Sequence, residues 1–130
     1  MTKNYLLLSV ALLGSLAAAA QSASPSASRP DCSNPQTQSD MNYCAALSYQ
    51  KADKDLNAVY KKLTGLMTAG EKAVLVQAQR QWILFRDAHC KLYETRYAGG
   101  SMMPMMVATC KEEITRSRIK ELTVLIEETK

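Results

Sequence analysis

The chemically richest stretch of the sequence is residues 78–90, Ala-Gln-Arg-Gln-Trp-Ile-Leu-Phe-Arg-Asp-Ala-His-Cys. It holds the chain's single Trp, Phe and His, together with two Arg and one Asp. Trp and Arg dominate the energetic centres of protein interfaces, which favours a recognition surface. The same residues also fit a helix with one buried side and charged flanks. We prefer the second interpretation and keep the first as the alternative.

His89 is a candidate for acid–base chemistry because imidazole titrates near neutral pH. No Ser-centred nucleophile motif, pair of catalytic carboxylates or phosphate-binding loop accompanies it in the sequence. Gly99-Gly100 is typical of a turn and not of a phosphate cradle. The sequence therefore predicts a protein that is not an enzyme and needs no cofactor, with His89 as a surface or hydrogen-bonded residue.

Methionine is concentrated in the segment Ser101-Met102-Met103-Pro104-Met105-Met106. Flexible thioether side chains could grip a protein partner, and thioethers are also soft ligands for copper(I). Packing beneath a turn is the third interpretation and the one we prefer. The candidate partner contacts that the sequence offers are Arg80, Met102, Met103 and Met105.

The first twenty residues have the layout of a secretory signal peptide. Lys3 precedes an uncharged run over residues 5–20, which ends in Ala18-Ala19-Ala20. This run is shorter than the ~20 residues that a membrane span needs. A retained anchor is the alternative, although no cysteine follows in a lipoprotein motif. We expect a periplasmic or extracellular protein that is soluble after cleavage.

The remaining chain divides into a leader and one domain. Residues 21–31 are rich in Ser, Ala and Pro and predict a disordered leader. Residues 32–130 then form a single domain with a thin core, because the 47% hydrophobic content includes the signal peptide. The net charge of +4 and the scattered basic residues argue against nucleic acid as a partner.

Four cysteines, Cys32, Cys44, Cys90 and Cys110, predict two disulfides in an exported chain of this size. A zinc site is disfavoured because the sequence has no Cys-x-x-Cys and its one histidine is adjacent to Cys90.

Three long helices account for the rest of the sequence. Thr37 with Asp40 and Thr68 with Glu71 have capping-box spacing, Gly99-Gly100 ends the second helix, and Ser101 is the predicted cap of the third. The apolar positions at helical spacing are Met41, Ala45, Leu56, Tyr60, Leu63 and Met67; then Leu75, Ala78, Trp82, Phe85, His89 and Tyr93; then Met106, Cys110, Ile114, Leu122 and Leu125. No segment alternates with period two, so we predict an all-α fold of antiparallel helices joined by short turns.

Mirroring residues about each turn predicts which positions are level across neighbouring helices. Cys90 is then level with Cys110, which leaves Cys32 for Cys44, while a Cys44–Cys90 bridge stays open as the alternative. By the same mirroring, Arg86 is level with Asp53, and Arg118 is level with Trp82. We therefore expect an ion pair in the first case and a cation–π contact in the second.

Several elements resemble the family of LprI-type lysozyme inhibitor N-terminal domains of secreted bacterial proteins. They are Cys32, Thr37-x-x-Asp40-Met41-x-x-Cys44-Ala45, Ala52-Asp53-x-x-Leu56-Asn57-x-x-Tyr60, Ala78-Gln79-Arg80-x-Trp82-x-x-Phe85-Arg86-Asp87-x-x-Cys90, Cys110 and Thr115-x-x-Arg118-x-x-x-Leu122. We expect Asp53, Asn57, Gln79, Trp82, Arg86, Asp87 and Arg118 to be its structural motif.

The resemblance implies a small, helical, disulfide-bonded exported protein that binds and inhibits lysozyme without catalytic residues. Under that hypothesis, side chains near the methionine-rich turn, or Arg80 and Arg86, approach the carboxylates of the enzyme's cleft. The alternative is a helical, non-catalytic interaction module whose partner is another envelope protein.

Overall fold

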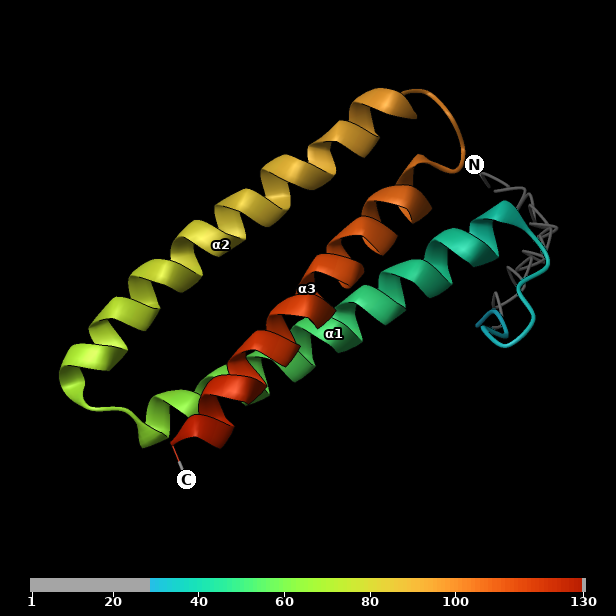
Figure 1. The fold of residues 1–130 in the computed structure, drawn as a ribbon. Helices are drawn as coiled ribbons and strands as arrows, with labels where there is room; N and C mark the ends of the chain where they lie inside the picture. The colour runs from blue at the N-terminus through green and yellow to red at the C-terminus, as the bar shows by residue number, and fades with distance from the viewer. Residues whose placement is uncertain (1–28, 130) are drawn as a thin grey trace, which may run out of the picture.

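The structure, a computed structural model, describes residues 29–129 and folds them into three helices (Figure 1). These are α1 (Gln38–Leu66), α2 (Ala69–Arg96) and α3 (Met103–Glu128). The described residues contain no strand, which confirms the all-α prediction. Between residues 29 and 129 no helix has both the length and the apolar character to cross a membrane. The predicted signal peptide and residues 21–28 of the predicted leader lie outside the described residues.

Both predicted capping boxes are present and start the first two helices. The Asp40 amide donates to the Thr37 hydroxyl at 3.1 Å, and the Thr37 amide donates to the Asp40 carboxylate at 3.0 Å. At the start of α2 the Thr68 amide donates to Glu71 at 2.8 Å. Hydrogen bonds from the Thr68 hydroxyl and amide lower the pKa of Glu71 below its ordinary value. These boxes satisfy amides that the first turn of a helix leaves without partners.

The prediction that Ser101 caps the third helix is wrong. Met102 occupies the N-cap position and makes no side-chain cap hydrogen bond, while Pro104 lies in the first turn as expected. A capping side chain needs an extended N-cap backbone to reach the next turn. Met102 instead has φ −87° and ψ −8°, and Ser101 lies one residue too early.

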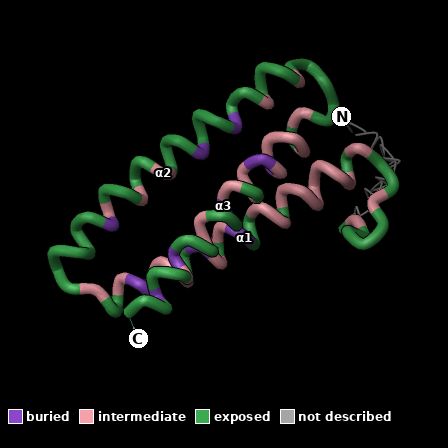
Figure 2. The backbone as a smooth tube through the Cα atoms, in the orientation of Figure 1, coloured by how far each residue is buried: buried purple, intermediate pink, exposed green. Residues whose placement is uncertain are grey.

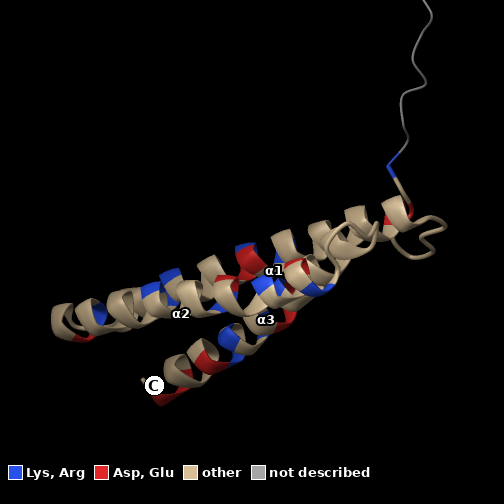
Figure 3. Ribbon diagram, turned by 90° about the horizontal axis from the view of Figure 1, so that it is seen from above, with Lys and Arg blue, Asp and Glu red and all other residues tan. Residues whose placement is uncertain are grey.

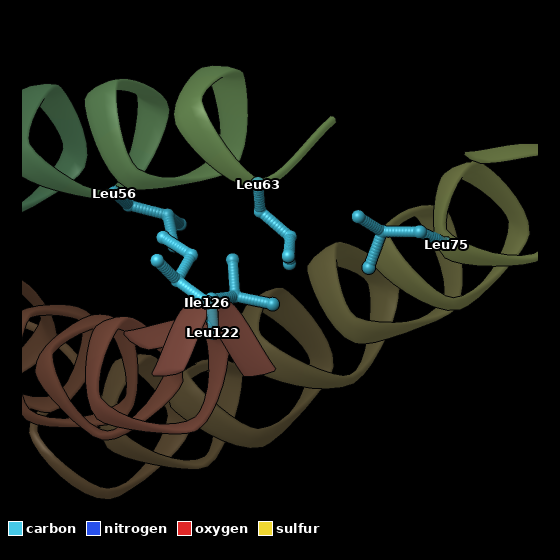
Figure 4. Close-up of a cluster of buried hydrophobic side chains, with 5 residues drawn as sticks. All are labelled: Leu56, Leu63, Leu75, Leu122 and Ile126. Atoms are coloured by element: carbon cyan, nitrogen blue, oxygen red, sulfur yellow. The ribbon is translucent and has the colours of Figure 1, made fainter. Parts of the chain in front are cut away.

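The core lies where α1 and α3 pack together. Leu56 and Leu63 of α1 point toward Leu122 and Ile126 of α3, and Leu75 reaches them from α2 (Figure 4). α2 packs against α3 and leaves most of its own surface exposed (Figure 2). The core is therefore built mainly by two helices.

The predicted buried face of the second helix is only partly correct. Leu75 is buried and Trp82 and Tyr93 are half-buried, but Ala78, Phe85 and His89 are exposed. Arg86 and Cys90 are the residues that turn inward at this point. The buried face of the helix is thus shifted toward Arg86 and Cys90 from the one that its apolar pattern predicts.

Two disulfides join the helices with the preferred connectivity. Cys32 is bonded to Cys44 with 5.5 Å between their Cα atoms, and Cys90 to Cys110 with 5.7 Å. The alternative Cys44–Cys90 bridge is therefore excluded. The first disulfide fastens the segment before α1 to that helix, and the second joins α2 to α3.

The two disulfides differ in exposure, which predicts the order of their reduction. Cys32 is exposed, whereas Cys90 is 0% exposed and Cys110 only 5%. Thiol–disulfide exchange requires access of the attacking thiolate to a sulfur atom. We expect mild dithiothreitol to reduce the Cys32–Cys44 disulfide at least tenfold faster than the Cys90–Cys110 disulfide. Alkylation followed by peptide mapping measures this order, and equal rates would contradict it.

Candidate interaction site

The centre of the α2 surface that faces the other helices is the guanidinium of Arg86, which is 7% exposed. Its Nη1 lies 3.4 Å from Oδ1 of Asp53 on α1, and its Nε donates to Asp87 at 3.0 Å. Nζ of Lys111 on α3 also lies 3.7 Å from the Asp87 carboxylate. The ion pair expected between Arg86 and Asp53 is therefore present, and it joins α1 to α2.

Aromatic rings cover the same guanidinium. Cζ of Arg86 lies 5.2 Å from the centroid of the Trp82 ring and 5.6 Å from that of Tyr49. Arg118 approaches Trp82 as expected, with Cζ at 6.0 Å from the ring. Burial raises the pKa of Tyr49, so the phenol stays neutral beside this cluster. Cation–π contact helps to compensate a guanidinium that has lost water.

Two amide side chains complete the group. Gln79 accepts from Nε of Arg118 at 3.1 Å, and Nδ2 of Asn57 donates to the Asp53 carbonyl at 2.9 Å. The expected motif residues, Asp53, Asn57, Gln79, Trp82, Arg86, Asp87 and Arg118, are thus brought together. Contacts among these residues join the three helices. Arg86 is therefore not free to approach the carboxylates of a partner, as the lysozyme hypothesis had allowed.

The candidate partner contacts do not form one patch. Arg80 is exposed in the middle of α2, whereas Met102 is exposed in the turn before α3. The sixteen residues from Arg80 to the end of α2 at Arg96 separate them by about 24 Å of helix. Met103 and Met105 are half-buried, and Sδ of Met105 accepts from Gln38 at 3.8 Å. Met103 and Met105 are therefore partly covered by the fold, and Met105 contacts α1.

The turn over residues 97–102 is exposed but held in place. Gly99 has a φ of 76°, a conformation that glycine adopts without strain, and the Gly100 amide donates to the Tyr97 carbonyl at 2.9 Å. Nδ2 of Asn42 on α1 donates to the Ser101 carbonyl at 2.9 Å. The Cys90–Cys110 disulfide fastens the helices that lead into and out of the turn.

A second exposed feature on α2 was not predicted from the sequence. Val74, Leu84 and Leu92 expose more than three-fifths of their surface, yet none of them was singled out. The signal was present in the sequence, because these residues are out of phase with the buried Leu75. Beside Val74 lies an open hollow of about 440 Å³. Its lining residues are Met67, Glu71, Val74, Leu75, Ala78, Arg118 and Leu125.

Among residues 29–129, neither charge nor metal-binding side chains gather in one place. Acidic and basic residues alternate over all three helices instead of gathering on one face (Figure 3). Within the described range no three His, Cys, Asp or Glu side chains are grouped so that they could hold a metal ion. His89 is exposed, with its ring 5.6 Å from that of Phe85.

Comparison with known proteins gives a family and one relative. The model of the family described as "Lysozyme inhibitor LprI" matches residues 30–122. An uncharacterized protein of Rhizobium meliloti is 39% identical over 111 residues, which cover 75% of this chain and 80% of that protein. No solved structure matches the chain.

The Arg86–Asp53 pair predicts an energetic coupling between α1 and α2. In a double-mutant cycle of Arg86→Ala and Asp53→Ala, we expect a coupling of about 1–2 kcal/mol, because one partner is buried and the other half-exposed. The control is Lys51→Ala with Asp55→Ala, an exposed pair within α1 that should couple by less than about 0.5 kcal/mol. Urea unfolding measures both, and equal couplings would contradict the prediction.

Proposed function

The chain belongs to the LprI lysozyme inhibitor family, and on that premise we propose that it binds lysozyme and inhibits it by protein–protein contact. The observation that carries this proposal is the extent of the family match. Residues 30–122 include α1, α2, most of α3 and all four disulfide-bonded cysteines. Most of the helical frame thus lies within the part that the family shares.

We infer that the turn over residues 97–102 is the element that enters the substrate cleft. It is narrow, because its tip consists of Gly99, Gly100 and Ser101, and the exposed side chain of Met102 follows them. The disulfide below it and the Asn42 hydrogen bond hold its conformation before binding. A preorganised element loses little entropy when it binds, which favours affinity.

Charge favours an apolar mode of contact. The chain carries a net charge of +4, and many lysozymes are themselves basic. Two positive proteins gain no electrostatic steering toward one another. The proposed affinity therefore comes from burial of Met102 and the glycine-rich tip, and Arg80 would add at most a local contact with an acidic group.

Inhibition of lysozyme requires that this chain and the enzyme meet outside the cytoplasm. We propose that residues 1–20 direct export, that residues 21–31 are a leader, and that residues 32–130 act in the periplasm or outside the cell. Two disulfides support this, since such bonds persist in oxidising compartments. The alternative function is a non-catalytic module for another envelope protein, which capture of partners from an envelope extract would reveal.

Inhibition is tested by the clearing of a bacterial cell-wall suspension by purified lysozyme. We expect the disulfide-bonded chain to slow clearing at micromolar concentration. Met102→Asp should raise the half-inhibitory concentration at least tenfold, because it places a charge in the proposed contact. The matched control is Val124→Asp, the same change at an exposed residue of α3.

Three outcomes would contradict the proposal or its details. Clearing that is unaffected by the chain would exclude inhibition of the lysozyme used. Equal inhibition by the Met102→Asp and Val124→Asp variants would exclude the turn as the contact. A loss of inhibition in Arg80→Glu alone would move the contact to the middle of α2.

A further inference from the structure

One exposed face of α2 carries a regular row of residues, which we call the α2 stripe. Its members are Val74, Ala78, Gln81, Phe85, Ala88 and Leu92, and all six are exposed. The large apolar members have exposed fractions of 70% for Val74, 56% for Phe85 and 62% for Leu92. Leu84 borders the row and is 63% exposed. A row of exposed apolar residues along one helix of a small protein favours a binding surface.

The spacing of the α2 stripe is that of a coiled-coil seam. Its residues follow one another at alternating steps of four and three, so that Ala78, Phe85 and Leu92 form one line and Val74, Gln81 and Ala88 the other. The row spans eighteen residue steps, about 27 Å of helix. The side of α2 that packs on α3 is a different one, which contains Leu75, Arg86 and Cys90. The seam therefore has no partner helix within residues 29–129.

We propose that the α2 stripe is a self-association surface, on which two copies of the chain pack their α2 helices antiparallel around a two-fold axis near residues 83–84. The sequence of the stripe is self-complementary in this direction. Val74 then faces Leu92 of the second copy, and Ala78 faces Ala88. Large residues meet at both ends, and the small residues between them allow the helices to approach closely.

The middle of the same pairing is also matched. Phe85 faces Gln81 of the second copy on either side of the axis, and the aliphatic part of Gln81 can cover the ring. Leu84 lies on one flank of the stripe, next to the axis, and so meets Leu84 of the second copy. At a two-fold interface, a residue next to the axis contacts its own equivalent in the second copy.

The hollow beside Val74 supports the same arrangement. Apolar side chains form most of its wall, namely Met67, Val74, Leu75, Ala78 and Leu125. The proposed axis places Leu92 of the second copy against Val74, at the mouth of this hollow. By symmetry the second hollow receives Leu92 of the first copy. Each copy thus offers an exposed leucine near one end of the stripe and a concave apolar surface near the other end.

Charges at the ends of the stripe favour the antiparallel over the parallel direction. Glu71 is exposed near its N-terminal end and Arg96 near its C-terminal end. Antiparallel packing brings Glu71 beside Arg96 of the second copy twice, whereas parallel packing would place like charges together. The helix dipoles of two antiparallel helices are also opposed, which is the favourable direction. Because one helix pair buries less area than a standard interface, we expect a dissociation constant in the micromolar range.

Analytical ultracentrifugation of the disulfide-bonded chain over a concentration series tests the proposal. We expect a monomer–dimer equilibrium that Phe85→Glu and Leu92→Glu each weaken at least tenfold. The matched control is Val124→Glu, the same kind of change at an apolar residue of α3 that is 52% exposed, which should leave the equilibrium unchanged. Circular dichroism of each variant checks that the helices are kept. A chain that stays monomeric at several hundred micromolar, or a dimer that tolerates Phe85→Glu, would overturn the proposal.

Single added cysteines test the direction of packing. Leu84→Cys places a thiol next to the axis, so two copies should form a cross-linked dimer under mild oxidation. Gln77→Cys lies one heptad earlier on the same flank and is also exposed, but its antiparallel neighbour is Lys91 of the second copy. It should cross-link at least tenfold more slowly on a non-reducing gel. Equal cross-linking of both variants would overturn the antiparallel arrangement.

Discussion

The rotation of α2 about its own axis is set by two residues four positions apart, Arg86 and Cys90. Cys90 is bonded to α3, and Arg86 is buried where Asp53, Asp87 and two aromatic rings compensate its charge. Removing a guanidinium from water is costly unless such partners surround it. Turning α2 to bury Phe85 would break the disulfide and take Arg86 away from its partners. The face of α2 that contains Arg86 and Cys90 is therefore buried, and the apolar face that contains Phe85 stays exposed.

That constraint explains both the thin core and the exposed face. The hydrophobic cluster is built from Leu56, Leu63, Leu122 and Ile126, with Leu75 as the contribution of α2. α2 buries little apolar area, so covalent and polar links contribute to its attachment instead. The disulfide limits the conformational freedom of the unfolded chain, and the ion pair fixes the register of the helices. A small domain stabilised in this way can leave several large side chains of one helix available for other contacts.

Much of this architecture could be predicted from the sequence because its signals are local or follow from symmetry about short turns. Thr37 and Thr68 mark helix starts, and mirroring about the turns placed Cys90 beside Cys110 and Arg86 beside Asp53. The prediction that Ser101 is the N-cap failed because the residue type alone does not determine the backbone conformation at the start of a helix. The prediction that Phe85 is buried failed for a different reason. Periodicity gives the spacing of an apolar face, while tertiary contacts decide how much of that face is buried.

The two proposed surfaces are compatible because they use different parts of α2. The stripe runs along the side of the helix, whereas the turn over residues 97–102 projects beyond its C-terminal end (Figure 1). Antiparallel packing about the middle of α2 necessarily places the two turns at opposite ends of the dimer. Residues 97–102 share no position with the stripe, so the proposed self-association and the proposed lysozyme contact use different residues. A dimer of this kind would present two equivalent sites, and its advantage would depend on whether lysozyme molecules are held close together on one cell wall.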